Sequence, residues 1–299
     1  MEKVTQEKKT TPEFLRNDRG RTKSNAIEIP SINLPKGGGA IKGVDEKFSV
    51  NAVNGTAAFS IPFPLSPARG ATPGLGLSYS SGSGNGTFGM GWSLNLPSIK
   101  RKTDKQLPQY NDGIDSDTFL FSDAEDLVPE FQKEIDGSFR VDPNGDYIIR
   151  EEESPDGNFR IRYFKPRLEG LFARIERWRH KATSEMKWRL ITKENFTTLF
   201  GWSAGSRIFD PMDGKRIYQW LPEISFDDKG NCIKYIYKRD DDRGFDAGLL
   251  HNRNRIVAGN ITYTNLYLKS VLYGNKTPYK SFGDPFNADA DFLFQLTLD

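Results

Sequence analysis

The segment Ile224-Ser-Phe-Asp-Asp-Lys-Gly-Asn-Cys-Ile-Lys-Tyr-Ile-Tyr237 decides the fold class. Apolar side chains recur at every second position on both sides of the polar run Asp227-Asp-Lys-Gly-Asn231. A period of two is the pattern of a strand with one buried face. Lys-Gly-Asn supplies the positive φ that a tight hairpin needs, so we expect a hairpin here with Gly230 in the left-handed region.

The same layout of strand, turn and strand recurs along the chain. Ser154-Pro-Asp-Gly-Asn158 precedes the alternating run Phe159–Tyr163, and Asp-Gly pairs stand at 136–137 and 213–214. Leu171, Ile175 and Trp178 fit a helical spacing, but their β-rich surroundings favour a strand. The sequence therefore predicts an all-β fold, with many short antiparallel strands and hairpins forming a curved sheet or shell segment.

Composition excludes several classes of protein. The 299 residues carry 42 Lys and Arg against 40 Asp and Glu, a net charge of +2, with the signs interleaved, so nucleic acid is not implied. The single cysteine, Cys232, excludes an intrachain disulfide and a Cys-based zinc cluster. No apolar run approaches the roughly 20 residues that cross a bilayer, so we expect no membrane insertion. The N-terminus lacks a secretory signal, so we expect a protein that is cytoplasmic before release and reaches the outside without a classical signal peptide.

Two regions differ in composition. Residues 1–30 are charged and polar, and we expect a disordered or loosely docked leader there. Residues 31–299 are predicted to form one all-β module. Its last apolar alternation, Phe292 to Leu298, stops at Asp299 without a turn, and we interpret this as a truncation at the C-terminus.

Two motifs resemble those of NAD-dependent proteins, but each lacks an element that NAD binding requires. Gly84-Asn-Gly-Thr-Phe-Gly89 matches G-x-G-x-x-G, but a dinucleotide site needs a helix after the third glycine. Met90 to Pro97 looks like a strand instead, so we interpret the motif as a close-packed glycine loop. Glu151-Glu-Glu153 has the E-x-E spacing of ADP-ribosyltransferases, without the upstream arginine and Ser-Thr-Ser strand. A solvated charge run at a strand end is the favoured interpretation.

The remaining candidates are polar side chains with no supporting pattern. Calcium could bind at Asp112, Asp115 and Asp117, or at Asp289 and Asp291, but the EF-hand spacing is absent and turn-forming aspartates are favoured. His180, His251 and Cys232 complete the set, interpreted as two surface histidines and an inert strand cysteine, although a Cys-His pair stays open. The sequence predicts no catalytic, cofactor-binding or metal-binding residue, and no cofactor.

Several glycine and aromatic strings resemble a known family. They are Gly55-Thr-Ala-Ala-Phe-Ser-Ile-Pro-Phe-Pro64, Pro73-Gly-Leu-Gly-Leu-Ser-Tyr-Ser-Ser-Gly82, Gly86-Thr-Phe-Gly-Met-Gly-Trp-Ser-Leu94 and the 227–231 turn. They are similar to the N-terminal domain of the Salmonella virulence plasmid B protein (SpvB) family. The resemblance covers about residues 31 to 299.

The resemblance implies a structural role. This domain also opens the B component of tripartite insecticidal toxin complexes (Tc toxins), as the first part of a hollow β-shell that a β-propeller and Rhs/YD-type repeats continue. The shell encloses a toxic polypeptide, so the implied partners are the rest of the same chain and the A and C components. In the virulence plasmid protein the ADP-ribosyltransferase is a separate C-terminal domain. We therefore expect a non-enzymatic shell module.

Two other functions remain open. Trp178, Trp188, Trp202 and Trp220 suggest a carbohydrate- or surface-binding β-module, which solvent-exposed and co-aligned rings would support. Rings packed into the sheet would favour the shell. An enzyme of unrecognised type would need a deep pocket that holds polar residues with perturbed pKa values.

Overall fold

The computed structural model describes residues 26–27, 47–51, 55–104, 106–123, 125–168, 172–241, 243, 246, 248–257, 260–261, 263–279 and 291–298. Within these ranges the chain forms strands and two 3-10 helices, η2 (Ala204–Ser206) and η3 (Leu250–Arg255), with no α-helix. The predicted all-β fold is confirmed. None of the helices in these ranges has the length and apolar character needed to span a bilayer.

The chain divides into two compact units, and the predicted leader lies largely outside the described residues. The first unit comprises Met1–Ile61 and Ser78–Ser93, and the second comprises Pro62–Leu77 and Leu94–Asp299. Of residues 1–30 only Ala26–Ile27 are described, as β1. The leader therefore stays a prediction.

The first unit is built on a small antiparallel sheet. Its strand order is β1, β2 (Lys47–Asn51), β3 (Ala57–Pro62), β4 (Gly76–Ser80) and β7 (Trp92–Leu94). The hairpin of β5 (Asn85–Gly86) and β6 (Gly89–Met90) connects β4 to β7. The ring of Trp92 packs 6.1 Å from that of Phe59 and 5.3 Å from that of Tyr79, so aromatic contacts hold this sheet.

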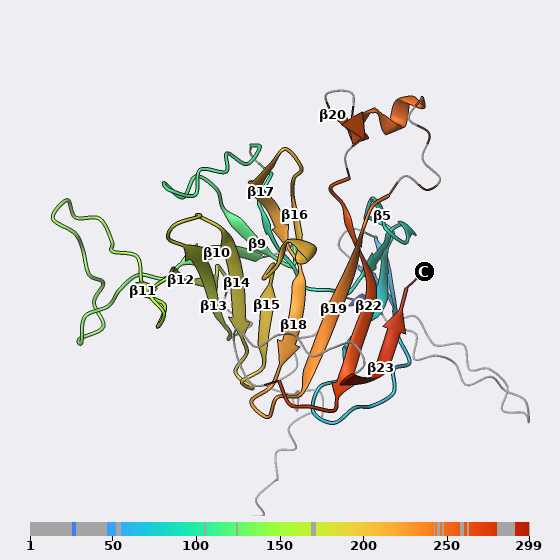
Figure 1. The fold of residues 1–299 in the computed structure, drawn as a ribbon, viewed down its shortest axis with the longest axis horizontal. Helices are drawn as coiled ribbons and strands as arrows, with labels where there is room; N and C mark the ends of the chain where they lie inside the picture. Colours follow the sequence, from blue (N-terminus) through green and yellow to red (C-terminus); the bar gives the residue numbers. More distant parts are fainter. Residues whose placement is uncertain are drawn as a thin grey trace, which may run out of the picture. The chain divides into compact units, whose positions relative to one another are not determined.

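The second unit is dominated by a 14-stranded antiparallel sheet (Figure 1). Along the sheet the strands run in the order β16 (Arg207–Asp210), β17 (Asp213–Trp220), β8 (Ile99–Arg101), β9 (Phe119–Phe121), β10 (Glu125–Pro129), β12 (Phe159–Pro166), β13 (Arg174–His180), β14 (Met186–Ile191), β15 (Thr197–Phe200), β18 (Pro222–Phe226), β19 (Cys232–Arg239), β22 (Leu266–Asn275) and β23 (Phe292–Thr297), with β11 (Glu151–Glu153) paired to β12. The short pair β20 (Ile256–Val257) and β21 (Asn260–Ile261) stands apart from it. Most neighbours in this order also follow one another in sequence, as a series of hairpins requires.

One half of this sheet curls back on itself. The indole Nε1 of Trp220 on β17 donates a hydrogen bond of 2.9 Å to the carbonyl of Met186 on β14, and the rings of Trp220 and Trp188 lie 6.0 Å apart. Strands distant in the sheet therefore share one apolar core, made of Ile99, Phe119, Leu127, Phe164, Ile175, Met186, Trp188, Leu190, Phe200, Ile217 and Trp220. The sheet is not closed, because β16 and β23 are its end strands. The predicted curvature is confirmed.

The strand alternation predicted from sequence is present. In β12, Ile161 and Tyr163 are buried while Arg160 is exposed. On the neighbouring strands, aromatic rings lie on both faces of the sheet. Trp178 packs with the cluster of Ile161 and Tyr163, whereas Trp188 belongs to the core of the curled half. Both faces of the sheet are therefore packed.

The segment of ambiguous periodicity is a strand. Ile175 and Trp178 lie on β13, paired with β12 and β14, while Leu171 lies outside the described residues. Ladder partners on both sides satisfy the backbone groups that a helix would have satisfied internally. The last apolar run forms the edge strand β23, where the ring of Phe294 stacks on that of Tyr273 at 5.1 Å.

The turn at residues 227–231 has the predicted conformation. Gly230 has φ of 81°, and its N–H donates to the Asp227 carbonyl. The Asp227 carboxylate accepts hydrogen bonds from the N–H groups of Lys229 and Asn231. A Cβ placed on Gly230 would lie 2.7 Å from the carbonyl oxygen of Tyr279, so glycine is required for space as well as for φ.

Gly230→Ala should lower the free energy of unfolding more than Gly157→Ala does. Both glycines have positive φ, but a Cβ on Gly157 would meet nothing within 4 Å. Left-handed strain alone costs about 1–2 kcal/mol, which sets the expected effect at Gly157. The backbone clash adds to it at Gly230. Urea denaturation of the two variants measures the difference, and equal losses would show that the Tyr279 contact is unimportant.

Candidate functional site

Three aspartates between β8 and β9 are held by three arginines of the second unit. Residues 109–117 form an irregular segment that contains Asp112, Asp115 and Asp117. The arginines are Arg101 at the end of β8, Arg162 on β12 and Arg177 on β13. We call these six residues the arginine–aspartate cluster. It fastens the 109–117 segment to the curled sheet.

Arg101 is the centre of this cluster and is 0% exposed. Its Nε donates to the carbonyl of Ile217 at 2.8 Å, and its two terminal nitrogens bind both carboxylate oxygens of Asp112 at 2.7 and 2.9 Å. Asp117 accepts a further bond of 2.6 Å. A buried guanidinium is stable only when its charge and its N–H donors are satisfied. Here two carboxylates face the charge, and four hydrogen bonds engage four of the five N–H donors.

Aromatic rings surround the same guanidinium. Its carbon lies 4.8 Å from the ring centroid of Tyr110, 5.3 Å from that of Phe119 and 5.5 Å from that of Trp220. Cation–π attraction strengthens when the cation is desolvated. The Arg101 side chain therefore links β8, β9 and β17 through a single group.

Asp115 pairs with the other two arginines of the arginine–aspartate cluster. Its carboxylate accepts a bond of 2.8 Å from Arg177 and also pairs with Arg162, whose Nε donates to Glu151 at 2.6 Å. Burial alone would raise the pKa of Asp115, but the nearby guanidinium groups of Arg177 and Arg162 hold it below its ordinary value. The carboxylate is thus kept ionised as an anchor.

The cluster is suited to structure and not to chemistry. Its carboxylates are neutralised by guanidinium groups, which cannot act as general bases and would repel a metal cation. Burial would raise the pKa of Asp117, but hydrogen bonds from the N–H groups of Gln109 and Tyr110 and the charge of Arg101 lower it overall. Asp112 and Asp115 lie in a turn, as favoured for these aspartates, and Asp117 accepts hydrogen bonds from the N–H groups of Gln109 and Tyr110, while the arginine pairing was not predicted. Asp289 lies outside the described residues.

The glycine motif forms a hairpin instead of a phosphate loop. Gly84 immediately precedes β5, residues 85–89 lie in β5, β6 and their turn, and strand β7 follows, where a dinucleotide site would need a helix. A Cβ on Gly86 would collide with the Trp92 carbonyl oxygen. The close packing expected of this loop is therefore present at Gly86, whereas a Cβ on Gly84 or Gly89 would meet nothing within 4 Å.

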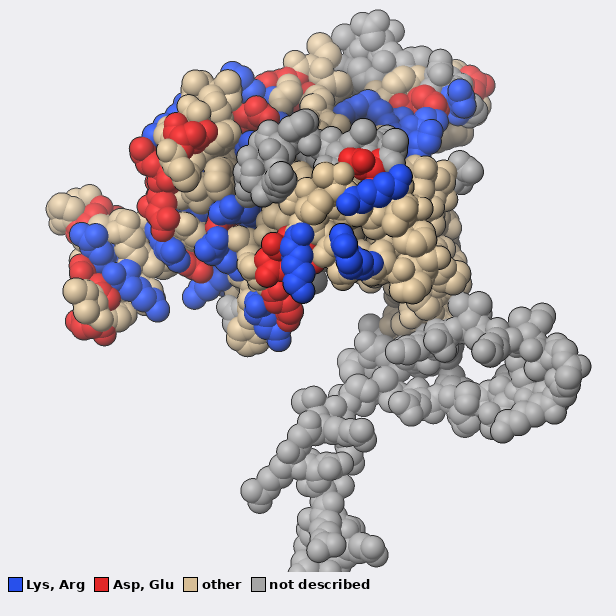
Figure 2. Space-filling model, turned by 60° about the horizontal axis from the view of Figure 1, so that its bottom comes forward, with Lys and Arg blue, Asp and Glu red and all other residues tan. Residues whose placement is uncertain are grey.

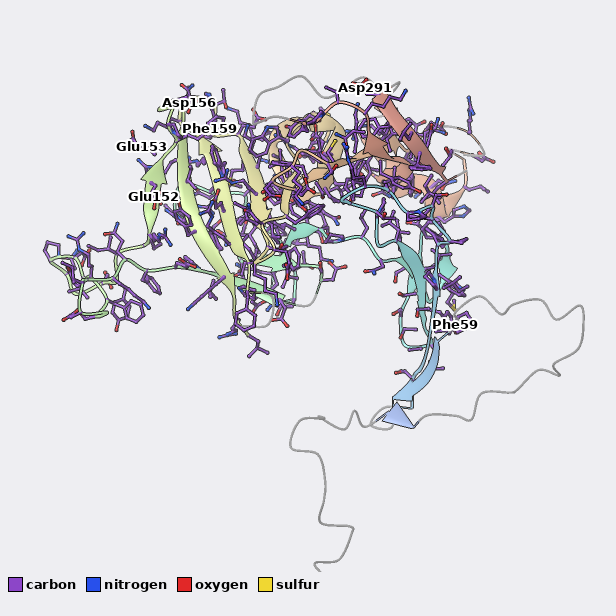
Figure 3. All side chains as sticks on the ribbon, turned by 90° about the horizontal axis from the view of Figure 1, so that it is seen from below. Phe59, Glu152, Glu153, Asp156, Phe159 and Asp291 are labelled. Carbon is purple, nitrogen blue, oxygen red and sulfur yellow. The ribbon has the colours of Figure 1, made fainter. Side chains whose placement is uncertain are left out.

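Glu151, Glu152 and Glu153 form strand β11, beside β12 (Figure 3). Glu151 binds Arg162, as described above, and Glu152 accepts a hydrogen bond of 2.8 Å from the Tyr163 hydroxyl. Glu153 pairs with Lys181 at 2.6 Å. Glu152 and Glu153 are exposed, as in a solvated charge run, and all three carboxylates also bind neighbouring side chains.

The two histidines and the cysteine lie in three different environments. His180 is half-buried, with its ring 5.0 Å from that of Phe159, and its Nδ1 accepts a hydrogen bond from the N–H of Thr183. His251 is exposed. Cys232 is buried, and burial raises the pKa of its thiol to about 12, so it is almost entirely protonated at neutral pH.

The tryptophans proposed for glycan binding are packed inside the sheet. Trp188 and Trp220 are 0% exposed and Trp178 is 8% exposed. Trp202 is half-buried and packs beside Trp178 at a ring separation of 6.0 Å. None of the four forms a solvent-exposed platform, which favours the shell interpretation. Figure 2 shows acidic and basic side chains interleaved on the face in view, without a stripe of one sign.

The comparisons with known proteins agree with this architecture. The family described as Salmonella virulence plasmid 65kDa B protein (SpvB) matches residues 51–299. The chain belongs to the SpvB family. The Mono(ADP-ribosyl)transferase SpvB of Salmonella typhimurium is 35% identical to it over 245 residues, which cover 82% of this chain and 38% of that protein. The chain thus spans little more than a third of this SpvB relative.

Two solved structures share the SpvB-family fold. The TcdB2–TccC3 crystal structure superposes with a TM-score of 0.71 at 32% identity, covering 91% of this chain and 12% of that one. The N-terminal domain of the effector SpvB from Salmonella typhimurium strain LT2 superposes with a TM-score of 0.60 at 33% identity, covering 75% of this chain and 65% of that one. Both confirm the resemblance seen in the sequence.

Arg101→Met should destabilise this SpvB-family chain by about 3–5 kcal/mol, because Asp112 and Asp117 would be left without their buried counter-charge. Arg160→Met is the matched control. Arg160 is exposed and lies 3.6 Å from Glu151, so its loss should cost less than about 1 kcal/mol. Urea denaturation at pH 7 compares the two, and a similar loss in both would refute the central role of Arg101.

The difference in the free energy of unfolding between the wild type and Arg101→Met should decrease in acid. Asp117 has a lowered pKa in the folded chain, so the stability that its carboxylate contributes is present above its unfolded pKa of about 3.9. That stability is lost as pH falls through the folded pKa. Repeating the denaturation near pH 3 tests the sign. A gap that widens there would contradict the assignment.

Proposed function

We propose that this chain forms part of the wall of a Tc-like toxin shell, which encloses a toxic polypeptide and helps to deliver it. The observation that carries the proposal is the superposition of 91% of the chain on the TcdB2 and TccC3 structure. The sequence resemblance to Tc toxin B components supports the same role.

The packing of the second unit suits a wall. One sheet of 14 strands has apolar clusters on both faces, and the arginine–aspartate cluster ties its curled half together. A wall must keep its shape without a ligand, and a sheet that is buried on both sides resists local opening. The proposed partners are the remainder of the same polypeptide, with a β-propeller and Rhs-type repeats, and the A and C components. The TcdB2–TccC3 complex supports the C component. The Photorhabdus luminescens Tc holotoxin pore, which superposes on 91% of this chain, supports a place in a complete Tc complex that includes the A component.

We also propose that the chain has no enzymatic activity of its own. The transferase named in the Salmonella typhimurium relative belongs to a protein of which this chain covers 38%, and the two E-x-E carboxylates here pair with basic side chains, Glu151 with Arg162 and Glu153 with Lys181. Purified protein incubated with NAD+ should neither release nicotinamide nor label itself or an added protein. Turnover that is lost in Glu153→Gln would contradict this.

A domain exchange tests the wall directly. The segment of TcdB2 that superposes on this chain is replaced by residues 51–299, and the hybrid is produced together with TccC3. The hybrid should form a particle with TccC3 that shields the enclosed polypeptide from an added protease. TcdB2 without the segment should leave it open to cleavage. A hybrid that assembles with TccC3 but protects no better than the deletion would refute the proposal.

A further inference from the structure

The segment between β10 and β11 contains an internal repeat and projects from the sheet as an arm. Aromatic residues recur eight positions apart at Phe131, Phe139 and Tyr147, and glycines recur at the same interval at 137 and 145. We call residues 130–150 the repeat arm. It extends from the sheet at the left of Figures 1 and 3, next to β11.

Backbone hydrogen bonds join the three repeats in a ring. The N–H of Gln132 donates to the carbonyl of Ile148, the N–H of Ile148 donates to the carbonyl of Arg140, and the N–H of Arg140 donates to the carbonyl of Gln132. Each repeat therefore binds both of the others. A closed set of three bonds leaves no repeat free to swing independently of its neighbours.

Aromatic packing and turn geometry stiffen the arm. The three ring centroids lie 5.4 to 6.1 Å apart. Asp136 accepts a hydrogen bond from the N–H of Ser138, and Gly137 has the positive φ of 87° that such a turn needs. The arm is thus ordered before any partner arrives, which lowers the entropy cost of binding.

A pocket of about 790 Å³ lies where the arm meets the sheet. Val128 and Pro129 of β10 and Lys165 of β12 form the sheet side, while the arm contributes its three rings, Glu130, Lys133 and Arg150. The volume is in the range of known ligand sites. Phe139 and Tyr147 are 46% and 57% exposed, and Ile135 and Val141 on the same arm are exposed too. Such a concentration of exposed apolar side chains on one projection marks an interaction surface.

The charges around the pocket select for an anion. Glu130, the acidic residue of the lining, is paired with Arg150 at 3.1 Å, and that guanidinium also lies 3.9 Å from the ring centroid of Tyr163. Lys133 and Lys165 are exposed, and neither makes an ion pair within the described part of the chain. Two cations beside exposed rings lack a negative counterpart.

We propose that this pocket binds an extended acidic segment of a partner protein that also carries an aromatic or aliphatic anchor residue. Carboxylates of the segment would pair with Lys133 and Lys165, and its anchor would pack among Phe131, Phe139 and Tyr147. The rings meet at angles of 81°, 49° and 60° and share no plane, so they do not present the flat platform on which a sugar stacks. Two lysines are also too few for a nucleic-acid backbone. This inference does not depend on the shell.

Peptide binding measured by fluorescence anisotropy tests the proposal on the whole chain. One labelled probe alternates Asp or Glu with Phe and Leu, a second has Lys in place of the acidic residues, and a third has Ser in place of Phe and Leu. The first probe should bind at least about tenfold more tightly than either of the others. Raising the salt concentration should weaken it.

Charge reversal locates the site. Lys133→Glu combined with Lys165→Glu should weaken binding of the first probe by about tenfold or more, and both positions are exposed, so the fold should be retained. Lys269→Glu is the matched control, because Lys269 is an exposed strand lysine on β22. Equal binding of all three probes, no binding of any, or binding that survives the double reversal would overturn the proposal. So would binding of sialyllactose in place of the acidic peptide, which would assign the pocket to glycans.

Discussion

The buried guanidinium of Arg101 is the interaction on which the curled half of the sheet depends. This guanidinium needs its carboxylate partners, because an unpaired charge at that depth would cost several kcal/mol. In the folded chain this one group on β8 therefore binds both the 109–117 segment and β17. The apolar core of the curled half adds non-directional contacts, which tolerate small changes of side-chain shape. The directional bonds to Asp112, Asp117 and the Ile217 carbonyl fix the geometry that those contacts then fill.

Local features of this fold could be predicted from the sequence, and distant ones could not. The turn at Gly230 could be predicted because its glycine, aspartate and flanking alternation lie within a few residues of one another. The alternation of β12 could be predicted for the same reason. The role of Arg101 could not be predicted, because its string Ile99-Lys-Arg-Lys-Thr103 has the composition of a solvated strand and its carbonyl partner lies 116 positions away. The same limit applies to Asp115, whose two arginines come from later strands.

The repeat arm shows a different kind of omission. Its eight-residue period is visible in the sequence, but two or three short repeats are easily interpreted as separate hairpins, and only the Asp136-Gly137 turn was predicted. The tryptophan content, by contrast, suggested a feature that the structure does not show. Four tryptophans suggested a binding surface, yet their rings stabilise the interior, because nothing in the sequence distinguishes a ring that faces water from one covered by the opposite strands. On the arm, by contrast, the rings of Phe139 and Tyr147 are exposed.

The spacing of the Arg101 partners has a consequence for the order of events on the ribosome. Asp112 and Asp117 follow the arginine by 11 and 16 positions, whereas Ile217 follows it by 116. At about 5–20 residues per second, the two carboxylates emerge roughly 0.5–3 seconds after the guanidinium, and the carbonyl roughly 6–23 seconds after it. The charge can thus be neutralised by near neighbours during translation, well before β17 exists to cover it. The costly step of taking a cation out of water is divided between an early salt bridge and a late burial.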